Sequence, residues 1–307
     1  MSQNITLTVN STLVDLMREH YSSFIVNNSG EYIDFQAKVN GVVITAFLSK
    51  RDTKKVTFVG KNAEEEAKQW ELNAIASTGS EEKVKPVKKG WIFFEDQIGS
   101  DEVGVGDFLG PMIVVAAFVS KEDINKLREL GVQDSKKMND SYIMEIGPQI
   151  AKQFKYSKLT LPNEKYNKVL EQGENLNSMK AKMHNRALLN LHKERPNVLN
   201  IFIDQFVKEE TYYKYLDDPN EEQVKGIIFR TKGESCFPCV ALASVIARYA
   251  YLLEMKKLSQ KYGMEFPFGA SQKVTDFAKK FVKKYGEKEL DKVAKKNFAN
   301  YNEVLAK

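Results

Sequence analysis

Four acidic residues stand in surroundings that disfavour charge. Asp101 and Glu102 are adjacent at the end of an apolar segment that is predicted to be a β-strand. Asp204 ends a second apolar segment, and Glu234 directly precedes a long apolar helix. A carboxylate at the end of a buried strand costs several kcal/mol unless it is paired or bound to a metal. The four residues are therefore candidates for one shared site.

Converging carboxylates without His or Cys ligands favour hard cations such as Mg²⁺ or Mn²⁺. Such a cluster can hold two ions roughly 4 Å apart, one activating water and the other stabilising the leaving oxygen of a phosphodiester. Each acid alone has a simpler interpretation. Asp101 or Glu102 could be a turn residue, Asp204 a strand-end cap, and Glu234 a residue favoured by a helix dipole. The spacing alone leaves both interpretations open.

Other residues with chemical potential give weaker signals. Gly104 and Gly106 let the backbone approach a substrate and expose N–H groups to phosphate or sugar oxygens. The surrounding GVGDFLG leads into a strand, so it is no dinucleotide fingerprint, and the chain has no P-loop. Cys236 and Cys239 form a C-x-x-C pair whose redox interpretation competes with that of small core cysteines. His184 is more typical of a structural hydrogen-bonding residue than of a ligand.

Alternating elements are expected to position these residues within 91–307. Strands are predicted over 91–104, 111–120 and 197–206, the last being nearly continuous in apolar residues, as in strands covered on both faces. Helical patterns occupy 121–130, 138–154, 177–194 and 239–263. This alternation predicts an α/β fold with a mixed sheet flanked by helices.

The N-terminal part is predicted to be a separate α+β module. Strand-like patterns lie at 4–10, 32–39, 42–50 and 54–60, with helices at 11–24 and 61–76 and a cap at Ser11 or Thr12. Residues 76–90 are rich in Ser, Gly, Lys and Glu, which is typical of a solvated linker. The predicted organisation is a domain over 1–75, a linker over 76–90 and a larger domain over 91–307.

Composition excludes several classes of protein. The chain has 307 residues, of which 42% are hydrophobic and 28% charged, enough apolar material for folded cores. No apolar run approaches 18 residues and no basic segment precedes an apolar run at the N-terminus, which argues against a membrane span and a secretory signal. Two cysteines cannot build a disulfide framework, and this fits a reducing, cytoplasmic location.

The positive charge is concentrated near the C-terminus. Lys and Arg number 46 and Asp and Glu 41, a net charge of +5. Residues 1–72 hold 8 basic and 9 acidic side chains, whereas residues 250–307 hold 13 Lys against 7 acids, or 13 − 7 = +6. Lysine pairs at 279–280, 283–284 and 295–296 fit either a solvated helix face or a surface for a phosphate backbone.

Several motifs together resemble one enzyme family. The segment GSDEVGVGDFLGP at 99–111, followed by DSKK at 134–137, resembles the opening signature of the type 2 ribonucleases H. The segment 198–206 resembles that family's third-acid strand, and TKGES before ALASVIARY resembles its fourth-acid segment, with Glu234 ten residues before Ser244. A glutamate at 234, the segment NLNSMKAKMHNRAL and an extra N-terminal domain resemble ribonuclease HIII rather than HII.

This resemblance implies a fold, an activity and a site. The fold would be a ribonuclease H-like mixed sheet flanked by helices, with a small N-terminal domain similar to the TATA-binding protein that helps to hold the substrate. Asp101, Glu102, Asp204 and Glu234 would be both catalytic and metal-binding, with two Mg²⁺ ions or Mn²⁺ as a substitute. The enzyme would cut the RNA strand of RNA–DNA hybrids and leave 3′-hydroxyl and 5′-phosphate ends.

The resemblance also implies substrate contacts. The backbone of Gly104, Val105 and Gly106 would face the 2′-hydroxyls, which distinguish RNA from DNA. Val105 departs from the family, since ribonuclease HII typically has Arg there and ribonuclease HIII commonly Thr. Valine at this position would cost little affinity or specificity if main-chain groups recognise the 2′-hydroxyl. It would cost more if a side-chain oxygen takes part. The residues of the DSKK segment would contact the substrate, the two lysines through phosphates: Ser135, Lys136 and Lys137.

Two alternatives stay open at this point. One is a ribonuclease HII, which also cuts at a single ribonucleotide embedded in DNA; the other is a module that binds hybrids without cutting them. Four acids facing phosphates argue against the second, because unused carboxylates would repel the ligand. The expected partner is a hybrid duplex, with no organic cofactor and no membrane, and the protein is expected to be a monomer.

Overall fold

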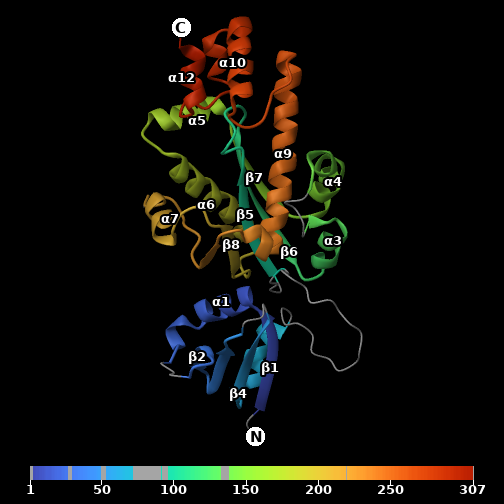
Figure 1. Ribbon diagram of the computed structural model, residues 1–307, viewed down its shortest axis with the longest axis vertical. Coiled ribbons are helices and arrows are strands. Elements are labelled where there is room, and N and C mark those ends of the chain that lie inside the picture. Colours follow the sequence, from blue (N-terminus) through green and yellow to red (C-terminus); the bar gives the residue numbers. More distant parts are fainter. Residues whose placement is uncertain are drawn as a thin grey trace. The chain divides into compact units, whose positions relative to one another are not determined.

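The chain folds into two compact units, Met1–Phe94 and Glu95–Lys307 (Figure 1). The computed structural model describes residues 3–26, 30–49, 53–71, 91, 96–132, 138–218 and 220–306. The predicted linker 76–90 lies outside the described residues, so the predicted domain limits stay predictions. Each unit has its own sheet and its own buried core.

The smaller unit contains a four-stranded antiparallel sheet in the order β1-β4-β3-β2. Its strands are β1 (Gln3–Asn10), β2 (Ile33–Val39), β3 (Val42–Phe47) and β4 (Thr53–Gly60). Helices α1 (Ser11–His20) and α2 (Ala63–Glu71) contact β1 and β4, and a 3₁₀ turn, η1 (Ser22–Phe24), follows α1. Alternate strand residues such as Leu7, Val9, Val56 and Phe58 are buried, as the period-two pattern predicts. The α+β module is confirmed.

Helix α1 is capped one residue earlier than predicted. The side-chain oxygen of Asn10 accepts a hydrogen bond from the Leu13 N–H at 2.8 Å, so the cap at Ser11 or Thr12 is wrong. Asn10 ends β1 in an extended conformation, which is the backbone geometry that an N-cap needs. One residue thus ends the strand and starts the helix.

The larger unit is built on a five-stranded mixed sheet in the order β7-β6-β5-β8-β9. Its strands are β5 (Asp96–Val103), β6 (Met112–Ser120), β7 (Tyr156–Leu161), β8 (Asn200–Asp204) and β9 (Ile227–Arg230). Strand β5 runs antiparallel to β6 and parallel to β8, and β8 runs parallel to β9. The predicted mixed sheet is confirmed, and its topology brings the carboxyl ends of β5 and β8 side by side.

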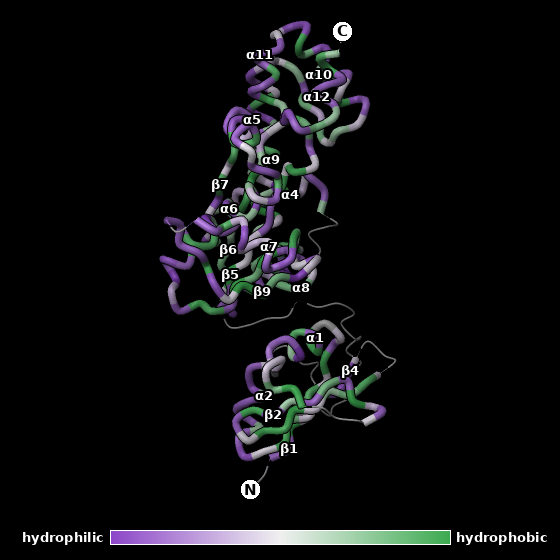
Figure 2. The backbone as a smooth tube through the Cα atoms, turned by 90° about the vertical axis from the view of Figure 1, so that its left-hand side faces the viewer, coloured by the Kyte–Doolittle hydropathy of each residue, from purple (hydrophilic) through white to green (hydrophobic). Residues whose placement is uncertain are grey.

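Helices cover both faces of this sheet, with α6 on one face and α9 on the other (Figure 1). They are α3 (Asp123–Glu129), α4 (Asp140–Gln153), α5 (Asn163–Glu171), α6 (Leu176–Glu194), α7 (Glu209–Tyr215), α8 (Gly233–Cys236), α9 (Pro238–Tyr262), α10 (Gln272–Tyr285), α11 (Glu287–Leu290) and α12 (Ala299–Leu305). Figure 2 shows hydrophobic and hydrophilic residues alternating along the outer helices, as amphipathic helices on a sheet require. Several short elements, among them β7, β9, α5 and α7, were not predicted from the sequence.

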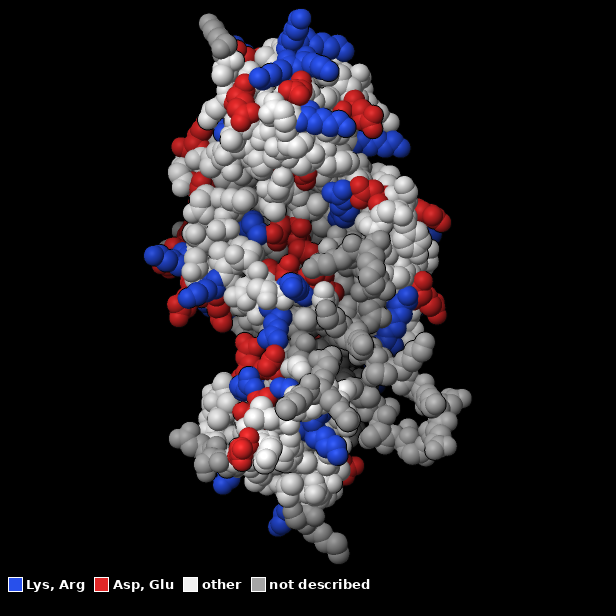
Figure 3. Space-filling view, in the orientation of Figure 1, with Lys and Arg blue, Asp and Glu red and all other residues white. Residues whose placement is uncertain are grey.

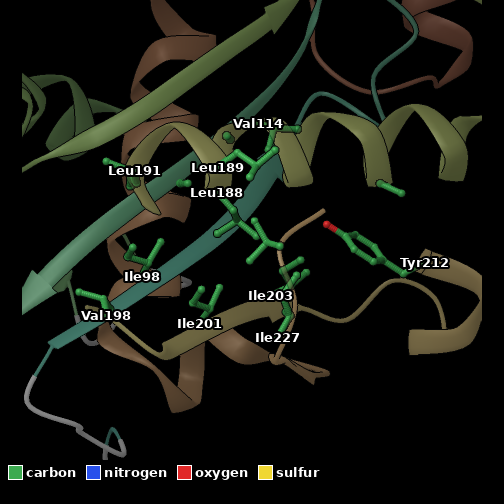
Figure 4. Packing of buried hydrophobic residues seen from close by; sticks show 14 of the residues in the cluster. Ile98, Val114, Leu188, Leu189, Leu191, Val198, Ile201, Ile203, Tyr212 and Ile227 are labelled. Carbon is green, nitrogen blue, oxygen red and sulfur yellow. The ribbon is translucent and has the colours of Figure 1, made fainter. Parts of the chain in front are cut away.

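The α6 face of the sheet carries a continuous hydrophobic core (Figure 4). Ile98, Ile201 and Ile203 project from β5 and β8 and pack with Leu188 and Leu191 of α6. Burying a side chain of this kind contributes roughly 1.5–3 kcal/mol. The core fixes α6 against the carboxyl ends of β5 and β8, where the candidate acids lie.

Helix α9 covers the opposite face and is the most apolar helix in the described part of the chain. It has 25 residues and a mean hydropathy of 1.3 over its best window, so by length and composition alone it could cross a membrane. That window is 72% buried inside the protein, as in the core helix of a soluble protein. Polar residues interrupt the apolar run of α9. A count of consecutive apolar residues therefore does not show how apolar the helix is as a whole.

Candidate active site

Asp101 and Glu102 lie on opposite faces of the sheet. A Cβ added at Gly99 would meet the Sγ of Cys239 at 2.6 Å, so this face of β5 packs closely on α9. Asp101 shares that face and accepts a hydrogen bond from Ser244 of α9. Glu102 faces α6 instead, because side chains alternate along a strand. Two acids that are neighbours in sequence thus have different surroundings.

Asp204 reaches the same level of the sheet as Asp101. Ser100 pairs with Ile203 in the parallel ladder of β5 and β8, so the next residues of the two strands lie next to each other. Ile203 belongs to the core on the α6 face, which leaves Asp204 on the α9 face with Asp101. The negative charge of Asp204 acts directly on the Asp101 carboxyl.

Glu234 is brought to this point by the turn after β9. The Gly233 N–H donates to Asp204 Oδ1 at 2.9 Å, and a Cβ at Gly233 would lie 3.3 Å from the Cα of Asp204. The preceding Lys232 adopts a left-handed conformation with φ of 60°. Glu234 is only 5% exposed. Asp101 and Asp204 therefore lie side by side, and Glu234 directly follows the glycine that is bonded to Asp204.

Asp101 is strongly perturbed by this arrangement. Burial, followed by the charges of Glu102 and Asp204, raises the pKa of the Asp101 carboxyl well above its usual range. Hydrogen bonds from Ser244 and from the Glu102 N–H oppose the shift without cancelling it. A buried carboxyl surrounded by like charges is stabilised when a cation neutralises the group.

Glu102 is held by two side chains of α6. Lys180 Nζ forms an ion pair with Oε1, and His184 Nε2 lies 2.9 Å from Oε2. Burial alone would raise the pKa of Glu102, but the hydrogen bond from His184 and the charges of His184 and Lys180 hold it below its usual range. The sequence predicts only a structural role for His184, and it does not single out Lys180, since a lysine inside an amphipathic helix gives no special signal.

The four acids are of the ligand type that suits a divalent cation, but their side chains are spaced apart. All four acids offer carboxylate oxygens, which Mg²⁺ and Mn²⁺ prefer. Among the residues that the structure describes, however, no three His, Cys, Asp or Glu side chains lie close enough together to hold an ion. Glu102 is turned to the far face of β5, where Lys180 and His184 bind its carboxylate.

The loop after β5 depends on one of its two glycines. Gly104 has φ of 83°, and a Cβ there would lie 2.3 Å from the Pro111 carbonyl oxygen. A Cβ at Gly106 would meet nothing within 4 Å. Val105 packs against the cluster that includes Met112 and Tyr166, so its side chain serves packing.

A buried lysine anchors the same loop. Lys295 is 0% exposed, and its Nζ donates to the carbonyl oxygens of Asp107 and Gly110 at 2.7 and 2.6 Å. Its N–H donates to the Phe108 carbonyl. The expectation that the pair at 295–296 lies on a solvated or basic helix face is therefore wrong for Lys295. A lysine is rarely fully buried, so its sequence context gave no warning.

A cavity of about 320 Å³ opens beside Glu102, lined in part by Met138, Ser244 and Arg248. Arg248 is fixed there by two hydrogen bonds to Asp140, at 2.9 and 2.7 Å. Figure 3 shows acidic side chains gathered in a hollow midway along the larger unit. The predicted substrate contacts Ser135, Lys136 and Lys137 lie outside the described residues.

The cysteines fit the packing interpretation better than the redox one. Cys239 is fully buried against Gly99, and burial raises the pKa of its thiol. Burial also raises the pKa of Cys236. Both are free thiols, and a reactive cysteine needs a lowered pKa instead.

Comparison with known proteins places these features in a family. Residues 98–301 match the family model of ribonuclease HII, and residues 4–83 match that of a domain of unknown function. A curated ribonuclease HIII from Bacillus cereus (strain AH187) is 39% identical over 309 residues, covering 98% of this chain and 97% of that protein.

Solved structures of ribonucleases H are also similar to this chain. The crystal structure of Bst-RNase HIII in complex with Mn²⁺ is similar with a TM-score of 0.67 and 36% identity, covering 99% of this chain and 98% of that one. Ribonuclease H2 from Pyrococcus horikoshii OT3 matches with a TM-score of 0.55 and 21% identity over 68% of this chain and 96% of its own. At that identity the second match supports the fold alone, and the predicted ribonuclease H-like fold is confirmed.

Proposed function

The chain belongs to the ribonuclease HIII family, and from this premise we propose that it cuts the RNA strand of RNA–DNA hybrids with the help of two Mg²⁺ ions. Its family membership makes it a hydrolytic endonuclease that acts on such hybrids. The observation that carries the proposal is the placement of Asp101 and Asp204 at one level of the sheet, with Glu234 tied next to them.

The carboxylates of Asp101, Asp204 and Glu234, together with Glu102, would hold the metal ions. Support comes from the raised pKa of buried Asp101, caused by burial and by the charges of Glu102 and Asp204, and from the Mn²⁺ complex of the similar Bst-RNase HIII. Two bound ions would supply an activated water molecule and neutralise the leaving oxygen of the phosphodiester. We infer that the products carry 5′-phosphate and 3′-hydroxyl ends.

Main-chain groups of the loop after β5 would read the ribose. Gly104 allows a backbone turn that a Cβ would block, and the Val105 side chain is used in packing. Lys295 fixes the carbonyl groups of Asp107 and Gly110. We therefore propose that 2′-hydroxyls meet backbone groups and that valine in place of threonine costs little.

Two further surfaces would contribute to substrate binding. Helix α10 exposes a row of lysines on one side: Lys273, Lys279, Lys280, Lys283 and Lys284. In the described part of the chain none of the five forms an ion pair, and Figure 3 shows Lys and Arg gathered at the α10 end of this unit. In the smaller unit, Thr6, Thr57, Thr45 and Gln36 align in register across the sheet. Thr45 is buried and accepts a hydrogen bond from Gln36, so Thr6 is the exposed hydroxyl of this row.

Replacing Asp101 tests the proposed site. Asp101→Asn should lower the cleavage rate at least about a hundredfold. Loss of a metal ligand should reduce activity no less than loss of a residue that only hydrogen-bonds to a ligand. Hybrid binding should stay within about twofold, because the lysine and main-chain surfaces remain. Cleavage of a labelled hybrid in Mg²⁺ and fluorescence anisotropy in its absence measure the two effects.

Asp96→Asn is the matched control, since Asp96 is exposed at the opposite end of the same strand. It should leave both quantities unchanged. Near-wild-type turnover of Asp101→Asn would contradict the assignment of these acids as the catalytic site.

A further inference from the structure

One face of α6 supplies both partners of Glu102. Lys180 and His184 are four residues apart, so their side chains lie on the same side of the helix. Lys180 binds Oε1 and His184 binds Oε2, so both oxygens of this carboxylate are engaged. The side chain of Glu102 is 12% exposed, and Glu102 is also one of the residues that line the cavity beside Ser244.

His184 is fixed from behind. Its side chain is 0% exposed, its Nδ1 lies 2.8 Å from Ser100 Oγ, and its ring stacks on Phe206 with the centroids 5.4 Å apart. An ionised carboxylate only accepts hydrogen bonds, so Nε2 donates to Glu102 while Ser100 engages the other ring nitrogen. Ser100 and Glu102 project from the same face of β5. The imidazole therefore has partners on both edges and a ring against its face.

Lys180 is bound in a different way. Its Nζ lies 3.9 Å from the centroid of Phe206, so the ammonium rests on an aromatic face while it pairs with Glu102. A lysine carries a point charge on a flexible four-carbon stem, which lets the ammonium leave one acceptor without moving the backbone. A divalent ion at Glu102 would be repelled by this ammonium over a short distance in a largely buried setting.

We propose that Glu102 exchanges one partner and keeps the other when a divalent ion binds. His184 and Ser100 are positioning residues that hold the carboxylate in both states, and Lys180 is an internal countercation that the ion replaces. The inference rests on the proposed function, because it requires Glu102 to be a metal ligand.

Two classes of variant are expected to act in opposite directions on metal affinity. Lys180→Met should tighten Mn²⁺ binding at least about fivefold, since even weakly coupled unit charges about 4 Å apart have an effect of this size. His184→Phe should weaken it about tenfold or more, as expected for loss of a residue that orients a ligand. Ser100→Ala should also weaken Mn²⁺ binding, but by a smaller factor than His184→Phe.

The measurement is a Mn²⁺ titration of the full chain without nucleic acid, followed by electron paramagnetic resonance of the free ion. Lys180→Arg keeps the charge and should leave the Mn²⁺ dissociation constant within about twofold. Lys182→Met is the control on the same helix, because Lys182 pairs with Glu174 outside this cluster. His184→Gln retains an N–H donor and should recover most of the affinity lost in His184→Phe.

The Mn²⁺ affinities of the variants test the two proposed roles separately. If Lys180→Met binds Mn²⁺ no more tightly than the wild type, the countercation role is wrong; if folded His184→Phe binds as the wild type does, the positioning role is wrong. Circular dichroism shows which variants fold, and Ser100→Ala decides the second point if His184→Phe does not. A wild type that binds no Mn²⁺ would instead overturn the proposed two-metal function.

Discussion

Two buried lysines organise the surroundings of the acids at the scale of single residues. Lys180 neutralises Glu102 from α6, and Lys295 holds the loop after β5 through the carbonyls of Asp107 and Gly110. Neither role is visible in the sequence, because burial of a lysine depends on segments that lie far apart along the chain. Asp107 and Lys295 are 188 positions apart.

Lys295 makes the stability of the larger unit depend on pH. Burial lowers the pKa of its ammonium to about 7, from 10.5 in a solvated lysine, and Asp107 opposes the shift. Between these two values the unfolded chain binds more protons than the folded chain. The free energy of unfolding should therefore rise with pH in this window, by at most about 1.4 kcal/mol per pH unit.

Urea denaturation at pH 7 and pH 9 checks this prediction. The wild type should gain about 1–2 kcal/mol between these pH values relative to Lys295→Met, which has no ammonium to desolvate. Lys296→Met is the control, because Lys296 is paired with Glu171 at the surface. Parallel pH profiles for wild type and Lys295→Met would contradict the prediction.

At the scale of elements, the register of β5 and β8 does most to form the site. The apolar run before Asp204 identifies β8 from the sequence, since continuous hydrophobic segments are typical of strands covered on both faces, whereas β5 has the mixed sequence DQIGSDEV. Strand alternation places Asp101 and Glu102 on opposite faces, and this could also have been inferred from their adjacency. The partners of each face, Ser244 of α9 and His184 of α6, come only from the tertiary packing.

The lysine face of α10 is expected to contact the phosphate backbone. Replacing Lys280 and Lys284 by Gln should weaken hybrid binding and lower the slope of log K against log salt by about 1–2, since each lost phosphate contact contributes about 0.9. Fluorescence anisotropy between 50 and 200 mM salt, about the range where this effect is large, measures it.

Exposed lysines outside α10 provide the control. Lys126 and Lys158 lie on α3 and β7, and their double Gln variant removes the same charge. If both double variants lower the salt slope equally, α10 has no special part in binding and its lysines form an ordinary solvated face.

At the scale of the whole molecule, two units with separate sheets imply a division of work. The N-terminal sheet carries a row of threonines in register, of which Thr6 is exposed, whereas the acids lie in the larger unit. Deleting residues 1–75 should raise the dissociation constant for the hybrid about tenfold or more, as expected if several phosphate contacts are lost. The remaining chain should keep its fold, because it has its own core. Anisotropy and circular dichroism measure both, and unchanged affinity would refute the supporting role.

The overall architecture was largely predictable, and the details of the site were not. Hydrophobic periodicity was sufficient for the strands β1–β6 and β8 and for the long helices, because these patterns are local. The short elements β7, β9, α5 and α7 were missed because few residues carry their pattern. Capping at Asn10 was misplaced by one position because a strand residue serves as the cap.

The cleavage pattern on three otherwise identical duplexes tests the central claim most directly. One strand carries a run of ribonucleotides, a single ribonucleotide or only deoxyribonucleotides, opposite the same DNA strand. We predict Mg²⁺-dependent cuts within the ribonucleotide run, with 5′-phosphate and 3′-hydroxyl ends, and no cleavage of the DNA duplex. Efficient cutting at the single ribonucleotide would favour the specificity of ribonuclease HII. Binding of the hybrid without cleavage in Mg²⁺ or Mn²⁺ would contradict the account.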